Sequence, residues 1–246
     1  MLTKYFSIVG YSNSGKTFVI EKIIKHLVKK GYKVGVCKYI HHSGFGIDIP
    51  DKDTTKFYES GAKIISYVSP DANGIINIEK EDINSILRNI ENKVDYLILE
   101  GFKNLTGVPR MAIIKEESDL KSLLDEFTIG ITSHLIDLSK HDLFIKDVDI
   151  PSFVEKRALP PMTSLNCQKC GYTSCKEFYK ALLLEKEDRS KCVLQIRKIK
   201  LFVNNKLILI NPFVEAVFRN VLLGIVDTLQ RPDEKINSIE INIKIE

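Results

Sequence analysis

The feature that most constrains the fold of this chain is the stretch GYSNSGKT at residues 10–17, which fits the pattern G-x-x-x-x-G-K-[ST] at every position. An apolar run, residues 4–10, leads into it and predicts a buried strand. The residues after it carry apolar side chains at helical spacing. In a strand–loop–helix, backbone N–H groups turn inward around an anion and the helix N-terminus adds positive partial charge. The pattern predicts a nucleotide phosphate loop, with Lys16 on the terminal phosphates and the Thr17 hydroxyl on Mg²⁺.

Apolar runs alternate with helical patterns up to about residue 150, which predicts an α/β fold with a doubly wound, mostly parallel sheet. The Pro160-Pro161 pair breaks this rhythm. Near the end, two β runs, a helix that begins at Pro212 and an alternating run up to Ile245 predict a ββαβ tail. We therefore expect three parts: a nucleotide-binding domain at 1–158, a small four-cysteine domain at 159–198 and the ββαβ tail at 199–246. The strands expected in the first domain are 4–10, 32–40, 63–69, 94–101, 111–117 and 127–133.

Composition limits the partners. Of the 246 residues 28% are charged, and the net charge of +4 is too small to indicate nucleic acid. No stretch is long and apolar enough to span a bilayer, and the first residues lack a basic region followed by an apolar one. We expect a cytoplasmic protein without nucleic-acid or membrane partners.

A phosphate loop needs an acid near the metal, and the run VDYLILEG at 94–101 offers Asp95 at its start and Glu100 at its end. Ligands of open parallel sheets lie outside the carboxyl ends of the strands, which favours Glu100. The letters NKVD at 92–95 match a guanine-reading motif, but they precede this strand, where they cannot face the base. We read that match as chance.

The loop after the second strand is polar and lies at the edge where active loops emerge. Lys38, His41 and His42 could contact an anionic ligand there. Asp48 and Asp53, the candidate catalytic residues, could serve the metal or position water. A solvated loop, with Asp53 as a helix cap, is the alternative.

Four of the five cysteines follow the spacing C-x2-C-x4-C-x16-C: Cys167, Cys170, Cys175 and Cys192. Such a cluster in a reducing compartment is more often a metal site than disulfides. Structural zinc usually takes two C-x2-C pairs, and the second pair is missing. Three close ligands and one remote ligand favour a [4Fe–4S] cluster, while zinc and redox thiols stay open. Cys37 is expected to be a small buried apolar residue.

Three stretches, residues 8–42, 46–54 and 94–103, resemble in order and spacing the MobB family, the P-loop proteins of molybdopterin guanine dinucleotide biosynthesis. The resemblance covers residues 3–160. It implies a homodimeric adaptor that prefers GTP, hydrolyses it weakly and works beside MobA, the guanylyltransferase that joins GMP to molybdopterin. One departure is Pro109-Arg110, where the family usually has proline and lysine.

The resemblance implies that residues 10–17 bind phosphates, that Thr17 and Glu100 lie near Mg²⁺, and that the loop around His41 faces the nucleotide or the pterin phosphate. The complete candidate nucleotide site is Gly10, Ser12, Asn13, Ser14, Gly15, Lys16, Thr17, Phe18, Lys38, His41 and His42.

The segment CQKCGYTSCKEF at 167–178, with the distant Cys192, resembles the small iron–sulfur domains of corrinoid iron–sulfur proteins and electron-transport subunits. This resemblance implies a [4Fe–4S] cluster held by all four cysteines.

Three hypotheses follow. The first is a GTP-binding accessory protein that assists a MobA-type transferase. The second is a redox-linked P-loop NTPase that serves metal-cofactor insertion or electron delivery through the cluster. The third makes the cysteine region and the tail a docking module for a molybdoenzyme or for the transferase.

Overall fold

The structure is a computed structural model that describes residues 2–40, 53–79, 81–91, 93–164 and 166–192, and after these 199, 201–203, 206–208, 210, 212–229, 236, 239, 241 and 243. The chain divides into two compact units, Met1–Lys191 and Cys192–Glu246, and each is described by itself. The three-part division drawn from the sequence stays a prediction.

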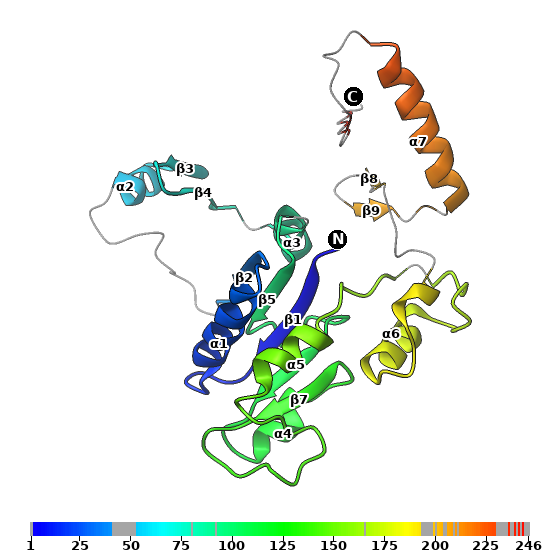
Figure 1. Ribbon diagram of the computed structural model, residues 1–246. Helices are drawn as coiled ribbons and strands as arrows, with labels where there is room; N and C mark the ends of the chain where they lie inside the picture. Colours follow the sequence, from blue (N-terminus) through cyan, green and yellow to red (C-terminus); the bar gives the residue numbers. More distant parts are fainter. Residues whose placement is uncertain are drawn as a thin grey trace. The chain divides into compact units, whose positions relative to one another are not determined.

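The first unit is built on a five-stranded sheet in the order β2-β5-β1-β6-β7, with every neighbouring pair parallel (Figure 1). This confirms the predicted α/β fold. The strands are β1 (Lys4–Val9), β2 (Val34–Lys38), β5 (Tyr96–Glu100), β6 (Arg110–Ile113) and β7 (Thr128–Thr132). The helices of this unit are α1 (Lys16–Lys29), α2 (Asp53–Glu59), α3 (Ile83–Ile90), α4 (Ser118–Leu123), α5 (Ile150–Arg157) and α6 (Cys175–Leu183), with a 3₁₀ turn at Arg189–Lys191.

Both faces of the sheet are buried, which explains why its strands read as continuous apolar runs rather than alternating ones. On β5, Ile98 packs in one core cluster with residues of α1 and α5, while Leu97 and Leu99 pack in a second cluster with Leu87 of α3. The apolar residues of α1 recur at helical spacing, which explains why this segment is a helix. The helix ends just before Gly31, which takes a φ of 87°. The core therefore fixes the carboxyl ends of β1 and β5 beside each other.

A β-hairpin lies outside the main sheet: β3 (Ile64–Val68) pairs antiparallel with β4 (Asn73–Asn77). The sequence predicted β3 but not β4. In the second unit, β8 (Leu201–Val203) and β9 (Lys206–Ile208) form an antiparallel hairpin, and α7 (Pro212–Asp227) follows. The predicted final strand falls mostly outside the described residues.

The cysteine-bearing segment up to Lys191 packs within the first unit. The rings of Phe127 and Tyr179 lie 6.2 Å apart, and the Tyr179 hydroxyl donates a hydrogen bond to the Pro160 carbonyl (3.2 Å). Glu126 forms ion pairs of 2.5 Å with both Lys176 and Lys180. Helix α6 is thereby fastened beside the start of β7.

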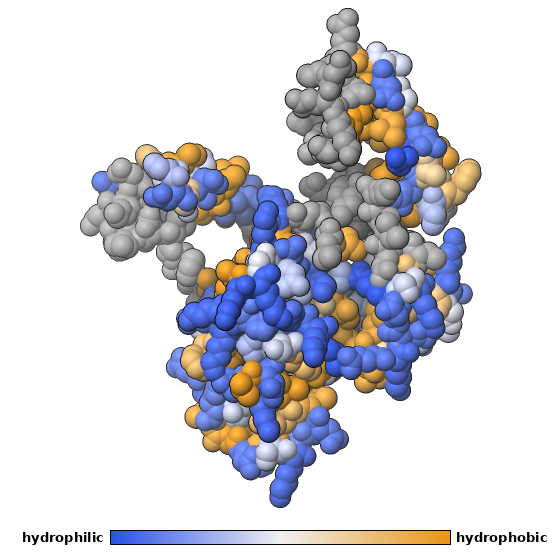
Figure 2. Space-filling model, in the orientation of Figure 1, coloured by the Kyte–Doolittle hydropathy of each residue, from blue (hydrophilic) through white to orange (hydrophobic). Residues whose placement is uncertain are grey.

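On the first unit, Figure 2 shows hydrophilic areas with hydrophobic areas between them. Over the described residues, no helix is both long and apolar enough to cross a membrane.

Arg110 stands where the resembled family usually has lysine, and it has a structural role. Its side chain is only 2% exposed and pairs with Asp125 (2.5 Å), while its other terminal nitrogen donates to the carbonyls of Phe102 (3.3 Å) and Leu105 (2.6 Å). Burial lowers the pKa of the guanidinium and Asp125 raises it. Arg110 thus ties the loop after β5 to the chain before β7.

We predict that Arg110→Ala lowers the free energy of unfolding by about 3 kcal/mol or more, because it removes the guanidinium that binds two loop carbonyls and pairs with Asp125. Arg110→Lys should lower the free energy of unfolding by less, because the lysine ammonium keeps the charge but lacks the planar, forked hydrogen-bonding geometry of the guanidinium. Chemical denaturation measures both. The exposed Lys25→Ala is the control and should stay within about 0.5 kcal/mol of wild type. An equally small effect of Arg110→Ala would contradict the assignment.

Candidate functional site

The loop between β1 and α1 has the backbone of an anion-binding turn. Asn13 and Gly15 take left-handed conformations, with φ of 59° and 91°. A Cβ on Gly10 would lie 2.5 Å from Ser14 Oγ and 2.9 Å from the Ile113 carbonyl oxygen. Successive left- and right-handed residues turn backbone N–H groups toward one concave side. The glycines are therefore required by the packing and curvature of this loop.

Lys16 lies over the loop, where its Nζ donates to the Tyr11 carbonyl oxygen (2.7 Å). Burial lowers its pKa, and the charges of Lys103, Lys38 and Lys115 act in the same direction, while Glu100 opposes them. Four ammonium groups thus surround the loop, with one buried carboxylate among them. A polyanion would relieve this mutual repulsion.

Glu100 is where the sequence predicted an acid near the loop. It ends β5 opposite Ile8 of β1, is only 7% exposed, and its Oε1 lies 3.3 Å from the Lys38 Nζ. Asp95 lies at the other end of β5, where it accepts a hydrogen bond from the Lys33 N–H (2.8 Å). Asp95 therefore has a structural partner far from the loop, and Glu100 is the acid beside it.

The remaining residues of the loop differ in exposure. Thr17 and Phe18 are exposed at the start of α1, and the Phe18 ring meets the His134 ring edge-on with centroids 5.9 Å apart. Ser14 is buried, and its Oγ has no hydrogen-bond partner among the described residues. An unpaired buried hydroxyl in a loop of this curvature fits a bound phosphate.

Part of the predicted site lies outside the described residues. His41, His42 and Asp48 are among them, and Asp53 opens α2 without a described side chain. Their proposed roles stay predictions. Lys38 is described, and its contact with Glu100 places it at the loop.

Sequence reasoning missed two residues at the loop. Lys103 Nζ lies 3.6 Å from the centroid of the Tyr11 ring, and Lys115 Nζ donates to the Ser12 carbonyl oxygen (3.3 Å). Lys103 lies in the stretch EGFK, at the end of the segment 94–103 that resembles the MobB family. That resemblance was a signal from which Lys103 could have been predicted. Lys115 follows β6, and it lies at the loop because β6 pairs with β1. The sequence alone does not show this pairing.

The cysteine loop has features of a thiolate site. Left-handed residues flank Cys167, namely Asn166 and Gln168 with φ of 48° and 59°. Cys175 opens α6, and its Sγ accepts from the Asn166 N–H (3.2 Å). Helix N-termini and N–H donors stabilise thiolate charge.

All five cysteines are half-buried, and no disulfide joins them. The donor set of four thiols therefore fits an iron–sulfur cluster or zinc. Across the described part of the chain, no three His, Cys, Asp or Glu side chains converge closely enough to hold a metal ion.

Comparisons with known proteins agree with both motifs. Residues 5–133 match the family model MobB, "Molybdopterin guanine dinucleotide synthesis protein B". Residues 164–194, which include all four clustered cysteines, match a second family model described as "Putative Fe-S cluster".

Similar chains are known from archaea and bacteria. The "Putative molybdopterin-guanine dinucleotide biosynthesis adapter protein" of Methanocaldococcus jannaschii is 29% identical over 245 residues, 98% of each chain. The molybdopterin-guanine dinucleotide biosynthesis adapter protein of Haemophilus influenzae is 26% identical over 155 residues, 60% of this chain and 85% of its own. The crystal structure of Bacillus subtilis MobB matches with a TM-score of 0.53 at 23% identity, covering 62% of this chain and 97% of that one, and this likeness shows the fold.

We predict that Glu100→Gln removes the gain in nucleotide affinity expected from Mg²⁺, about tenfold or more, because the carboxylate expected on the metal side is lost. Without Mg²⁺ the variant should bind at least as tightly as wild type, since a negative charge near the phosphates is gone. Titration calorimetry with Mg²⁺ or with EDTA measures both. Asp95→Asn is the matched control on the same strand and should keep the full Mg²⁺ effect. An undiminished effect in Glu100→Gln would refute this assignment.

Proposed function

Because this chain belongs to the MobB family and is a molybdopterin-guanine dinucleotide biosynthesis adapter protein, we propose that it binds GTP–Mg²⁺ and assists a MobA-type guanylyltransferase. The transferase would join the nucleotide to molybdopterin. The observation that carries the proposal is the meeting of the phosphate loop, Glu100 and four lysines at one edge of the sheet. An adapter works with other proteins of molybdenum cofactor biosynthesis, and the family resemblance supports a homodimer.

Each residue of the loop has a distinct part in this proposal. The backbone N–H groups of residues 10–15 bind the phosphates, and Lys16 leaves the Tyr11 carbonyl to reach the terminal ones. Thr17 and Glu100 hold Mg²⁺, directly or through water. Lys38 and Lys103 neutralise the remaining charge. Hydrolysis would be slow, in keeping with a role in binding rather than turnover; Asp48 and Asp53 are the candidates to position water.

The four cysteines would hold a [4Fe–4S] cluster, with zinc as the lesser alternative. Their spacing, the match over residues 164–194 and the N–H donor on Cys175 support this. A bound cluster would supply a one-electron carrier.

A redox-linked NTPase is the second candidate, and one observation favours it. Helix α6, which begins at Cys175, is fastened to the same compact unit as the phosphate loop through Glu126. This candidate requires robust hydrolysis that changes with the oxidation state of the cluster. A turnover rate indifferent to that state would exclude it.

A cofactor-assembly assay tests the main proposal. Protein purified without oxygen is added to a MobA-type transferase, molybdopterin and limiting GTP, and the guanine dinucleotide cofactor formed is quantified. Wild type should stimulate the reaction. Lys16→Ala should lose this effect, because the loss of a charge-assisted bond to phosphate lowers nucleotide affinity about 10- to 100-fold. No stimulation by wild type would refute the adapter role as stated and favour the redox-linked NTPase.

Metal analysis tests the cluster. Wild type reconstituted with iron and sulfide should hold about four of each per chain and absorb visible light. Cys170→Ser should lose most of both. Cys37→Ser is the matched control, because Cys37 lies in β2 away from the cysteine segment, and it should keep the cluster. Zinc bound tightly in place of iron would contradict the assignment.

A further inference from the structure

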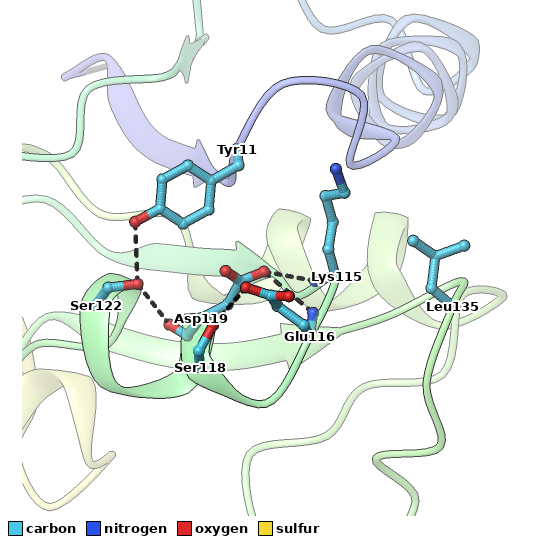
Figure 3. A pocket seen from close by; sticks show the side chains of 7 residues that line it. All are labelled: Tyr11, Lys115, Glu116, Ser118, Asp119, Ser122 and Leu135. Atoms are coloured by element: carbon cyan, nitrogen blue, oxygen red, sulfur yellow. Dashed lines mark hydrogen bonds between the residues drawn. The ribbon is translucent and has the colours of Figure 1, made fainter.

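A cavity of about 490 Å³ opens beside the phosphate loop (Figure 3). Its lining comes from that loop, from the turn between β6 and α4, from α4 itself, and from the residues after β7. This volume lies in the range of small-molecule sites in proteins. Most of its lining residues take no part in the phosphate site described above.

The cavity and the phosphate loop share a wall. The Tyr11 side chain belongs to both, and its hydroxyl donates to Ser122 Oγ of α4 (3.2 Å). Lys115 lines the cavity and donates to the Ser12 carbonyl oxygen (3.3 Å). A ligand whose phosphates lie in the loop would therefore have this cavity next to its remaining part.

The turn after β6 is fixed by a buried acid. Asp119 is 3% exposed, and its Oδ2 accepts from the backbone N–H groups of Lys115 (2.7 Å) and Glu116 (3.3 Å). Asp119 is thus occupied by the turn itself. Glu116 is exposed, and Ser118 Oγ donates to its Oε1 (2.5 Å), as Figure 3 shows. The Glu116 carboxylate keeps further acceptor positions for a ligand.

The lining suits a flat ring with N–H donors on one edge. Tyr11 offers an aromatic ring, and Leu135, 66% exposed, offers an apolar side chain. The Glu116 carboxylate can accept two N–H groups side by side. Guanine presents a ring N–H and a 2-amino group on one edge, whereas adenine presents a ring nitrogen lone pair there, which a carboxylate repels.

We propose that this cavity binds the guanine base of the nucleotide whose phosphates lie in the loop, and that Glu116 reads its ring N–H and 2-amino group. The proposal rests on the proposed function, because it needs a nucleotide in the phosphate loop. It makes Glu116 a specificity-determining residue, placed after β6 rather than in the chance NKVD match at 92–95.

Competition binding to the full chain tests this, with GTP, ITP, ATP and inorganic tripolyphosphate as probes. Wild type should prefer GTP to ITP, which lacks the 2-amino group, and ITP to ATP. Glu116→Gln should lose about 10- to 100-fold in affinity for GTP, with ATP and tripolyphosphate unchanged. Glu117→Gln makes the same charge change one residue away, outside the cavity lining, and should keep the wild-type preference. Unchanged tripolyphosphate affinity also shows that the variant is folded.

Three outcomes would overturn the proposal. A full GTP preference in Glu116→Gln would show that another group reads the base. Equal affinity of wild type for all three nucleotides and for tripolyphosphate would show that the loop binds phosphate while the cavity reads nothing. If no probe binds, including tripolyphosphate, the phosphate site of the proposed function fails first.

The same 2-amino-oxo edge occurs in pterins. Binding of 6-hydroxymethylpterin distinguishes a pterin ligand from guanine. A pterin without phosphates does not need Lys16, whereas the guanine nucleotide does. If the pterin binds wild type and Lys16→Ala equally and Glu116→Gln weakens it, while GTP is not preferred to ATP, then the guanine assignment is wrong.

Discussion

The site depends on one tight turn of the backbone between β1 and α1. Asn13 and Gly15 are left-handed, and the space beside Gly10 is closed by Ser14 and by the Ile113 carbonyl of β6. A side chain at Gly10 would push the loop away from β6. The shape of the phosphate loop is therefore not a property of its eight residues alone. It is set by the pairing of β1 with both β5 and β6, which the two apolar clusters hold in place.

Charge is the second organising principle. Lys16, Lys38, Lys103 and Lys115 come from four different segments, and the charges of the other three lysines help burial to lower the pKa of Lys16. Glu100 offsets only part of this repulsion. Such a cluster of like charges destabilises the compact fold, and a bound polyanion would relieve that cost. The buried Arg110 contributes indirectly, because it holds the loop in which Lys103 stands.

The part of the cysteine segment up to Lys191 packs within the first unit. Ion pairs to Glu126 and the contact between Phe127 and Tyr179 fasten α6 next to β7. Glu126 and Phe127 both lie in the turn that precedes β7, and the same turn carries Asp125, the partner of Arg110. One short turn thus supports the sheet, the loop after β5 and the helix that begins at Cys175.

The sequence by itself determined the phosphate loop, the end of β5 at which the acid lies, the spacing of the four thiols and the family. These are local patterns, because a glycine-rich turn or a pair of close cysteines carries its chemistry within a few residues. It missed β4, whose five residues NGIIN hold two asparagines and a glycine among few apolar side chains. Only the tertiary structure decided which residues meet the loop. Tyr11 contacts Ser122, and Lys115 contacts Ser12, across more than a hundred residues of chain. Those contacts follow from the order β5-β1-β6, and strand order depends on long-range packing that no local pattern records.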